Sequence, residues 1–465
     1  MSYQQILDTI GHTPLVEITK LDTGKCRLFL KLENQNPGGS IKDRIAVSII
    51  ADAEKRGLLK PGGTIIEATA GNTGLGLALV ARMKGYHIIL VIPDKMSQEK
   101  INHLHALGAE IVITRSDVGK GHPDYYQDLA LRISKEKNAF FANQFENPAN
   151  PLAHETTTGP EIWEQLNHEL DAVVVGIGSS GTMTGLTHFF QKVTDKVEIV
   201  LADPEGSILA EYVNTGNLST EVGSWLVEGI GEDFIPSIAD FSLTKKAYSI
   251  TDQESFDTVR ELISKEGILG GSSTGTLLAA ALKYCRDQTS HKNVVSFVCD
   301  SGNKYLSKMY NDYWLLEQGL FRREIYGDLR DIIARRFENN ATIFVGPKDT
   351  LQTAYARMKT YNISQLPVLA KNKIIGIIDE SDLLIALYSN KLTFMDPVEN
   401  SMTKELKIIR TDEPLESLVN VLSDGLVAIV EDRFGNFQGL ITKIDLINYL
   451  KMQKINSELL SSPIL

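Results

Sequence analysis

The sequence NPGGSIKDR, residues 36–44, separates a predicted strand from a predicted helix. The strand is the apolar run CRLFLKLE at 26–33, after which a proline and two glycines require a turn. Ser40 is a favourable N-cap for a helix over 42–57, in which apolar residues recur at helical spacing. Lys42 then stands in the first helical turn, where the helix dipole disfavours a cation. Such a lysine loses its proton more readily and can form a Schiff base.

Short β-rich runs alternate with helix-length segments from about Thr64 to Gly302. The predicted strands read TIIEA, HIILVIP, EIVIT, NAFFAN, DAVVVGIG, VEIVLAD, KAYSIT and NVVSFVCD. This alternation, with nearly continuous apolar strands, predicts an open, mostly parallel α/β sheet covered by helices on both faces. Folds of this kind bind their ligands at the carboxyl ends of the strands.

Three glycine-rich segments each precede a predicted helix: TAGNTG at 69–74, GIGSSGT at 176–182 and GGSSTG at 270–275. Backbone N–H groups in such loops, together with a helix N-terminus, can bind an anion. The first segment suits an amino-acid carboxylate. The second suits a phosphate, with the hydroxyls of its serines and threonine as further donors. Taken alone, the first segment is explained equally well as a tight turn between a strand and a helix, and the third is well explained as a capped helix start.

The second segment also matches the GxGxxG pattern of dinucleotide-binding proteins, and Asp203 closes the next strand where the acid of that pattern would stand. An NAD-dependent enzyme is therefore an alternative. However, the motif begins past the middle of the α/β region, and no other motif requires a nicotinamide. A lone lysine is more often a solvated surface residue, but here it accompanies a phosphate cradle and an uncharged partner for a pyridine nitrogen. Pyridoxal phosphate requires this combination.

The ordered motifs GGSIKDR, EATAGNTG, GSSGTMTG and GGSSTG resemble the β-family of pyridoxal-phosphate enzymes, fold type II, which includes cysteine synthase and cystathionine β-synthase. Four longer stretches are similar to the cystathionine β-synthase branch: KMSQEKINHLHALGAEIV, NPANPLAHETTTGPEIW, ADPEGSILAE and VEGIGEDFIP. The resemblance extends from about residue 10 to residue 450. It implies the two-subdomain open sheet of the tryptophan synthase β-like fold.

The resemblance also implies roles for individual residues. Lys42 would be the Schiff-base lysine, Asn72 would hydrogen-bond the ring hydroxyl of the cofactor, and Ser273 would face the pyridine nitrogen. The phosphate would be held by Gly178, Ser179, Ser180, Gly181 and Thr182. The substrate would be bound by Thr69, Gly71, Thr73, Gln144 and Gly229.

The implied reaction is a β-replacement that condenses L-serine with L-homocysteine to L-cystathionine, with Lys42 as the base. Four positions depart from the family pattern: Ala70 replaces a serine, Ser180 a glycine, and Glu232 and Phe145 tyrosines of the animal enzymes. Because these departures surround the substrate side chain, O-acetylserine as first substrate and sulfide as second remain alternatives. The haem-binding extension of the animal enzymes is missing, so we expect no haem.

After about Tyr313 the pattern changes, and an arginine-rich segment at 322–336 leads into an internal repeat. KIIGIIDESDLLIAL from Lys373 returns as NFQGLITKIDLINYL from Asn436, with a helix-like segment upstream of each copy. Two helix–strand–strand–helix units this short should pack on each other as a pair. We therefore predict a catalytic domain at 1–315, a linker at 316–336 and a regulatory module at 337–465.

The repeat resembles paired CBS domains, also called a Bateman module. The resemblance implies an adenosyl ligand, for which the second copy supplies Thr442 and Asp445. In the first copy Asp382 remains, but Asp379 replaces the hydroxyl residue, and its carboxylate should repel a phosphate. A module that only mediates oligomer contacts is the alternative.

Composition restricts the partners and the location of the chain. The net charge of −12 argues against nucleic acid and anionic membranes as partners. Three cysteines without a CxxC motif, no signal peptide and no spanning segment predict a cytoplasmic protein. His103 and His105 form a close pair without further ligands, so we expect no metal site.

The resemblance implies a homodimer or higher homo-oligomer. A non-catalytic sensor is a further alternative, against which the intact set of Lys42, Asn72 and Ser273 argues.

Overall fold

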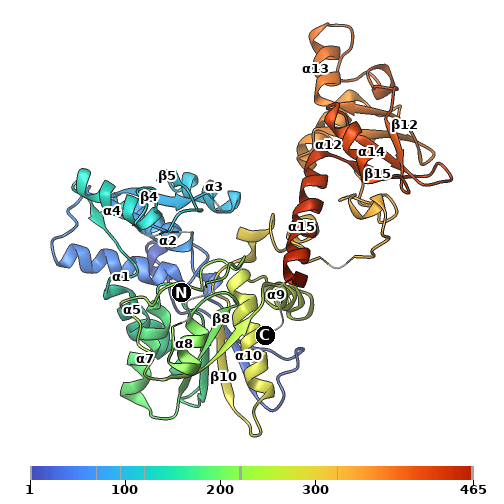
Figure 1. Cartoon of the computed structure of the whole chain (residues 1–465). Coiled ribbons are helices and arrows are strands. Elements are labelled where there is room, and N and C mark those ends of the chain that lie inside the picture. The colour runs from blue at the N-terminus through green and yellow to red at the C-terminus, as the bar shows by residue number, and fades with distance from the viewer. Residues whose placement is uncertain are drawn as a thin grey trace. The chain divides into compact units, whose positions relative to one another are not determined.

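The computed structural model describes residues 3–69, 71–94, 96–119, 121–218, 222–321 and 323–461, without the side chains of 454–461. The chain divides into two compact units, Met1–Tyr310 and Asn311–Leu465, which we call the N-terminal and C-terminal units. Figure 1 shows the first in blue to yellow and the second in orange to red.

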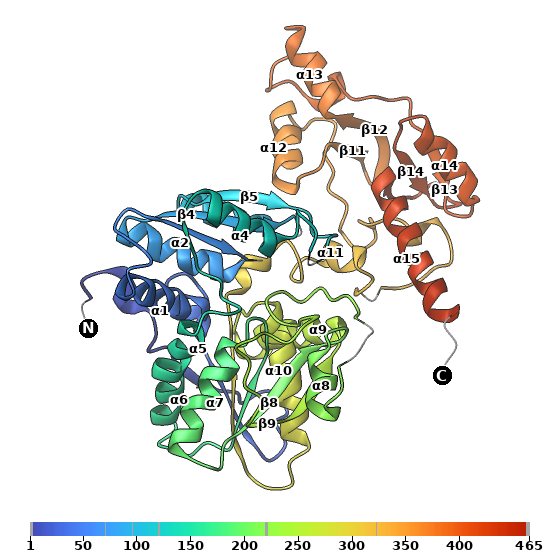
Figure 2. The same ribbon diagram turned by 60° about the vertical axis from the view of Figure 1, so that its left-hand side comes forward.

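The larger sheet of the N-terminal unit has the strand order β1-β2-β10-β7-β8-β9. All neighbouring strands pair in parallel except β1 with β2. Residues of the central strands are buried on both faces, as their continuous apolar sequences require. Helices including α8 and α10 pack against this sheet (Figure 2). The strands are β1 (Leu15–Glu17), β2 (Arg27–Lys31), β7 (Ala172–Val175), β8 (Glu198–Pro204), β9 (Thr244–Ile250) and β10 (Asn293–Phe297), and the two helices are α8 (Leu209–Thr215) and α10 (Ser272–Arg286).

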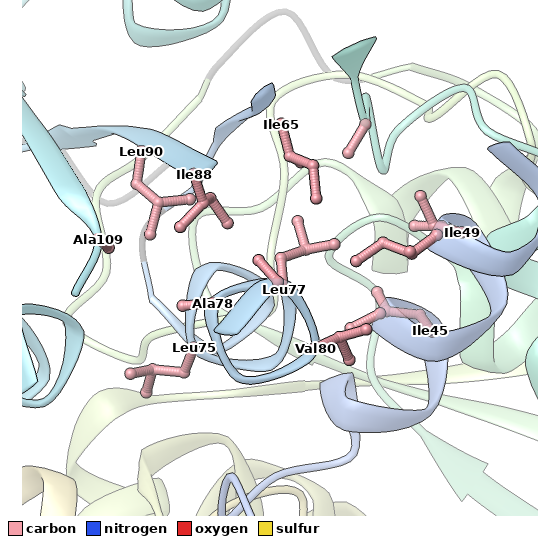
Figure 3. Packing of buried hydrophobic residues seen from close by; sticks show 14 of the residues in the cluster. Ile45, Ile49, Ile65, Leu75, Leu77, Ala78, Val80, Ile88, Leu90 and Ala109 are labelled. Carbon is pink, nitrogen blue, oxygen red and sulfur yellow. The ribbon is translucent and has the colours of Figure 1, made fainter. Parts of the chain in front are cut away.

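The smaller sheet has the order β5-β4-β3-β6 and is entirely parallel. Ile65 and Ile88 lie opposite each other on one face, in a cluster with apolar residues of α1 and α2 (Figure 3). Their neighbours Ile66 and Ile89 lie on the other face, against α4. Helices therefore cover both faces, and the predicted mostly parallel α/β fold is confirmed. The elements are β3 (Thr64–Ala68), β4 (His87–Pro93), β5 (Glu110–Thr114), β6 (Phe140–Phe141), α1 (Lys42–Lys55), α2 (Asn72–Lys84) and α4 (Tyr126–Glu136).

Three local features of this unit differ from the predictions. The strand β1 was not predicted, since three residues carry too little pattern. ETTTGPEIWEQL at 155–166, a helix-length segment of the sequence, is not one regular α-helix: it includes a π-helical turn at His154–Thr158 and continues as α6 (Gly159–Gln165). Ile41 is the N-cap residue of α1, although the Oγ of Ser40 still accepts the N–H of Lys42 at 3.3 Å. The remaining helices are α3 (Gln98–Ala106), α5 (Ala149–Ala153), α7 (Gly181–Val193) and α9 (Asp252–Glu266).

The C-terminal unit contains the two predicted copies. The first comprises α12 (Leu351–Tyr361), β11 (Gln365–Ala370), β12 (Lys373–Asp379) and α13 (Glu380–Tyr388). The second comprises β13 (Ile408–Arg410), α14 (Leu415–Ser423), β14 (Ala428–Glu431), β15 (Phe437–Ile441) and α15 (Lys443–Ser461), and α11 (Asp312–Glu317) contacts α15. Leu369 of the first copy packs with Ile429 and Phe437 of the second, so the predicted association of the two copies is confirmed.

Candidate active site

Lys42 stands where the turn before α1 meets the segment that follows β10. The N–H of Ile41 donates to the carbonyl of Cys299 at 2.9 Å, and Ser40 pairs with Asp300 in an isolated bridge. Lys42 is half-buried, and among the described residues its Nζ makes no hydrogen bond or ion pair. Burial lowers the pKa of Lys42, although Cys299 and Asp300 raise it. The direction is the one expected from the sequence, but burial and not the helix dipole is its main cause.

Ser273, the second residue of α10, is joined to Lys42 through Cys299. The N–H of Cys299 donates to the Oγ1 of Thr274 at 3.2 Å, and its thiol hydrogen-bonds with Ser273. Burial raises the pKa of Cys299 to about 12, while the charge of Lys42 lowers it. Cys299 is thus a neutral thiol between an amine and a hydroxyl.

The predicted phosphate loop lies before α7 and close to Lys42. A Cβ on Gly178 would stand 2.6 Å from the carbonyl oxygen of Gly229, so these two glycine backbones are in close contact. The Oγ1 of Thr182 lies 3.3 Å from the Nε2 of His154. Burial and the charge of Lys42 lower the pKa of His154, which links this loop to the lysine. The loop, Gly229 and Lys42 therefore belong to one site.

Two serines of this loop are already engaged. Ser180 has a φ of 70°, the left-handed conformation in which glycine is most easily accommodated. Its hydroxyl lies 3.1 Å from that of Thr184, and the Oγ of Ser179 accepts a hydrogen bond from the Nδ2 of Asn150 at 2.9 Å. The family's glycine at position 180 suits this backbone better than the serine found here.

The predicted substrate residues also lie together. The N–H of Gly71 donates to the Oγ1 of Thr69 at 3.1 Å, and the hydroxyl of Thr73 donates to the Oε1 of Gln144 at 2.7 Å. Ala70, the first departure from the family pattern, lies outside the described residues. These contacts place Thr69, Gly71, Thr73 and Gln144 in one group at the start of α2.

The other departures lie nearby. The Oε1 of Glu232 is 3.9 Å from the Cβ position of Gly178. Besides burial, the charges of Asp233 and Glu232 raise the pKa of Tyr125 to about 12. Glu232 therefore lies between the phosphate loop and Tyr125, the residue before α4. The ring of Phe145 packs against that of Phe234, with 5.7 Å between the ring centroids.

Asn72 has partners that we did not predict. Its Nδ2 donates to the Oδ2 of Asp300 at 2.7 Å, and its Oδ1 accepts from the Nζ of Lys304 at 2.9 Å. The hydroxyl of Tyr305 also donates to Asp300, at 2.7 Å. All three follow β10, and the carboxyl end of a parallel strand is where ligand-binding groups are expected. Their position directly after β10 was the only feature of the sequence that could have identified these residues as part of the site.

A second unpredicted group joins α3 to the loop that contains Gly229. The Nζ of Lys100 donates to Glu228 at 2.6 Å and to the hydroxyl of Tyr305 at 3.0 Å. Lys308 donates to the other oxygen of Glu228 at 2.6 Å. These ion pairs connect α3, which lies by the smaller sheet, to the loop that contains Gly229, beside the substrate residues.

Asp203 does not occupy a dinucleotide-binding position. It is buried, and its Oδ2 accepts the N–H of Ala210 at 2.8 Å at the start of α8. Burial raises the pKa of Asp203 to about 6. The Asp203 carboxylate is used by the local backbone and is not available to bind a ribose. The NAD alternative therefore lacks its acidic residue.

In the C-terminal unit, Thr442 and Asp445 bond to each other. The backbone N–H and the hydroxyl of Thr442 both donate to the Oδ2 of Asp445, at 2.7 and 2.5 Å. Burial raises the pKa of Asp445, while Arg335 and Arg323 lower it. Asp379 and Asp382 form the matching contacts at the start of α13. Both positions therefore have a structural task as helix caps.

The residues of the N-terminal unit fit pyridoxal phosphate. An amine without an ionic partner within the described ranges of the chain, a glycine loop at the start of a helix and a buried neutral hydroxyl meet at the carboxyl ends of the strands. In the described part of the chain, no three or more His, Cys, Asp or Glu side chains are grouped as they would be around a metal ion. No described helix has the length and apolarity to cross a bilayer.

Comparison with protein families agrees with this arrangement. The model "Pyridoxal-phosphate dependent enzyme" matches residues 6–300, and the model "CBS domain" matches residues 329–389 and 398–452. Fold and site thus define a pyridoxal-phosphate-dependent enzyme, a lyase, with a pair of CBS domains.

Individual relatives narrow the class. Cystathionine beta-synthase of Oryctolagus cuniculus is 36% identical over 466 residues, covering 96% of this chain and 84% of the relative. Cysteine synthase A of Escherichia coli is 40% identical over 304 residues, covering 64% of this chain and 92% of the relative. The structure of O-acetylserine dependent cystathionine beta-synthase from Helicobacter pylori has a TM-score of 0.61 and 36% identity, and covers 66% of this chain and 98% of that chain. The chain belongs to the cystathionine β-synthase family.

Proposed function

We propose that the N-terminal unit catalyses a β-replacement in which L-serine and L-homocysteine give L-cystathionine and water. The observation that carries this proposal is the placement of Lys42. Its amine lacks an ionic partner among the described residues, its pKa is lowered by burial, and its charge lowers the pKa of His154 beside the phosphate loop and of Cys299 beside Ser273. A buried amine of this kind can form a covalent bond with an aldehyde and can accept a proton.

Each part of the site would hold one part of the cofactor. When bound, pyridoxal phosphate would withdraw electrons from the α-carbon of the substrate. Lys42 would hold its aldehyde carbon, Asn72 its ring oxygen, and the N–H groups at 178–182 its phosphate. The Ser273 hydroxyl would donate to a neutral pyridine nitrogen without supplying a counter-charge.

The side chains around Lys42 would then carry the substrate through the reaction. The N–H groups and hydroxyls of Thr69, Gly71 and Thr73, with Gln144, would bind the serine carboxylate. The freed amine of Lys42 would take the α-proton and pass it to the β-hydroxyl, which would leave as water. The sulfur of homocysteine would bond to the β-carbon and give its proton to Lys42, which would return that proton to the α-carbon.

O-acetylserine is the second candidate for the first substrate, and sulfide for the second. The Helicobacter pylori structure named above is of an O-acetylserine-dependent enzyme, and this chain departs from the family pattern at Ala70 and from the animal enzymes at Glu232. The test is kcat/KM for serine and for O-acetylserine, each with homocysteine and with sulfide. We expect serine with homocysteine to give the highest value. Turnover with O-acetylserine alone would reject serine, and a preference for sulfide would indicate a cysteine synthase.

A visible absorption spectrum tests the cofactor separately from the substrates. Purified protein given pyridoxal phosphate should become yellow, and its band should shift with L-serine and return with homocysteine. A protein that stays colourless after the cofactor is added would contradict the proposal before any substrate is considered.

We further propose that Thr442 and Asp445 of the C-terminal unit bind an adenosyl ligand, supported by the match to the CBS domain model and by Arg323 and Arg335 near Asp445. Titration calorimetry with S-adenosylmethionine, AMP and ATP is the test. We expect Asp445→Ala to abolish the heat of binding and Asp382→Ala, which removes the matching cap in the first copy, to preserve it. Equal loss in both variants would indicate a structural effect, and no heat from any ligand would favour an oligomerisation module.

We also infer that the chain acts in the cytoplasm as a homodimer or a higher homo-oligomer. Sedimentation of the purified protein tests the second statement, and a monomer over the working concentration range would contradict it.

A further inference from the structure

The amide of Asn72 is held on both sides by charged groups that follow β10. Its Oδ1 accepts from the ammonium of Lys304 at 2.9 Å, and its Nδ2 donates to the carboxylate of Asp300 at 2.7 Å. Lys304 is 7% exposed and Asp300 is fully buried, so solvent cannot replace either contact. Both contacts are charge-assisted hydrogen bonds, which are stronger than neutral ones.

These two charges determine which way the amide faces. A free asparagine amide can rotate by half a turn at little cost, because its oxygen and nitrogen ends have similar shapes. In Asn72 that rotation would set N–H groups against the ammonium of Lys304 and the amide oxygen against the carboxylate of Asp300. Both contacts would become repulsive, so a single orientation remains. In it, one N–H of Nδ2 is used by Asp300 and the second is left to donate elsewhere.

Lys304 connects this amide to the loop of the reactive lysine. Its Nζ also donates to the carbonyl of Gly38 at 3.0 Å and to that of Gly39 at 3.1 Å. The three acceptors match the three N–H bonds of an ammonium. The bonds to Gly38 and Gly39 hold the ammonium in place, so that its third N–H is directed at the Oδ1 of Asn72.

We propose that Lys304 and Asp300 are positioning residues for the cofactor: together they fix the amide of Asn72 so that its second N–H is directed at the ring oxygen of pyridoxal phosphate. This inference rests on the proposed function, because it requires Asn72 to contact the cofactor. Neither residue belongs to the motifs that carry the family resemblance, and neither touches the cofactor itself in this scheme.

The protonation of Lys304 gives the arrangement a pH dependence. Burial lowers the pKa of Lys304 to about 8, with Asp300 and Asp43 raising it and Lys100 lowering it. His103 also faces Lys304, whose charge lowers the pKa of that histidine further below the value set by burial. Below about pH 8 the ammonium supplies three donors, and above it the neutral amine supplies only two for three acceptors. The hydrogen bond that Lys304 donates to Asn72 should therefore weaken as the pH rises through 8.

The test is a double-mutant cycle on cofactor affinity. The dissociation constant of pyridoxal phosphate is measured by quenching of protein fluorescence for the wild type, Lys304→Met, Asn72→Ala and the double variant. We expect each single variant to bind about tenfold more weakly. Because Lys304 acts through Asn72, we expect the double variant to bind no more weakly than Asn72→Ala. Lys304→Arg, which keeps the charged donor, should recover part of the affinity.

Each outcome separates this inference from the proposed function. Multiplied effects, about a hundredfold in the double variant, would show that Lys304 acts independently of Asn72 and would overturn the inference. Full affinity in Asn72→Ala would refute the role of Asn72 itself. If Lys304→Met does not fold, Asp300→Asn replaces it in the same cycle. The wild-type affinity should fall above pH 8 and that of Lys304→Met should not, and equal pH profiles would also contradict the inference.

Discussion

Lys42→Ala is expected to lower kcat by roughly 10³-fold or more without unfolding the protein. The substitution removes both the amine that would hold the cofactor and the base that would take the α-proton. It leaves the packing intact, because the Nζ of Lys42 makes no hydrogen bond or ion pair with the described residues. The measurement is steady-state formation of cystathionine, with circular dichroism to verify the fold.

Lys55→Ala is the matched control, since Lys55 is the exposed last residue of the same helix, α1. It should retain the wild-type rate. Reduction with borohydride in the presence of pyridoxal phosphate adds an independent readout. The mass of the wild type and of Lys55→Ala should increase by one cofactor, and that of Lys42→Ala should not. Near-normal turnover in Lys42→Ala would refute the whole assignment of the site.

Arg44→Ala should reduce the free energy of unfolding of the N-terminal unit by about 3–5 kcal/mol. Arg44 is buried two residues after Lys42, and its guanidinium binds both Glu33 and Glu161 at 2.7–2.9 Å. Removing it leaves the buried carboxylate of Glu33 without its cation. Urea unfolding followed by tryptophan fluorescence measures the loss.

Arg56→Ala provides the comparison, because Arg56 forms an exposed ion pair with Asp52 just beyond the end of α1. Exposed pairs of this kind contribute about 0–1 kcal/mol. Similar losses in the two variants would show that the buried ion pairs stabilise the fold no more than an exposed pair does.

The buried ion pairs around Arg44 should also lose their stabilising effect in acid. Burial raises the pKa of Glu161, but Arg44 and Lys31 bring it down to about 2. The stabilisation is therefore complete above the ordinary glutamate pKa of about 4.5 and is lost as the pH falls towards 2.

Strand positions in the N-terminal unit could be predicted closely from the sequence because the signal is local. TIIEA, HIILVIP and EIVIT are apolar runs between turn residues, and they form β3, β4 and β5 at those positions. Lys42 and the glycine loops were found in the same way, since each lies at a boundary between a strand or turn and a helix, whereas the role of Ser273 was implied by the family resemblance. The strands of a parallel sheet end at one edge, which brings together the groups that follow β2, β7 and β10 of the larger sheet. The loop at the start of α2 follows β3 of the smaller sheet, and its approach to these groups could not be predicted from the sequence.

The residues that hold this site could not be found locally. Asp300 contacts Asn72 across 228 positions of the chain, and Lys304 reaches the same amide across 232. Nothing in the segment CDSGNKY indicates which distant side chain it will meet. In the C-terminal unit the repeat was visible, but the two bonds that Thr442 donates to Asp445, and the capping box of Asp379 and Asp382, show that a recurring Asp can be required by the helix as well as by a ligand.

The order of strands in the larger sheet has a consequence for how the polypeptide is made. β2, formed by residues near the N-terminus, lies between β1 and β10, and its parallel partner β10 begins only at Asn293. A ribosome-bound chain shorter than this can pair β2 with β1 alone, and it also lacks the segment that anchors the turn before Lys42. The sheet must therefore close after almost the whole unit has been synthesised. Until then β2 presents an unpaired apolar edge, which makes the growing chain a natural client for chaperones.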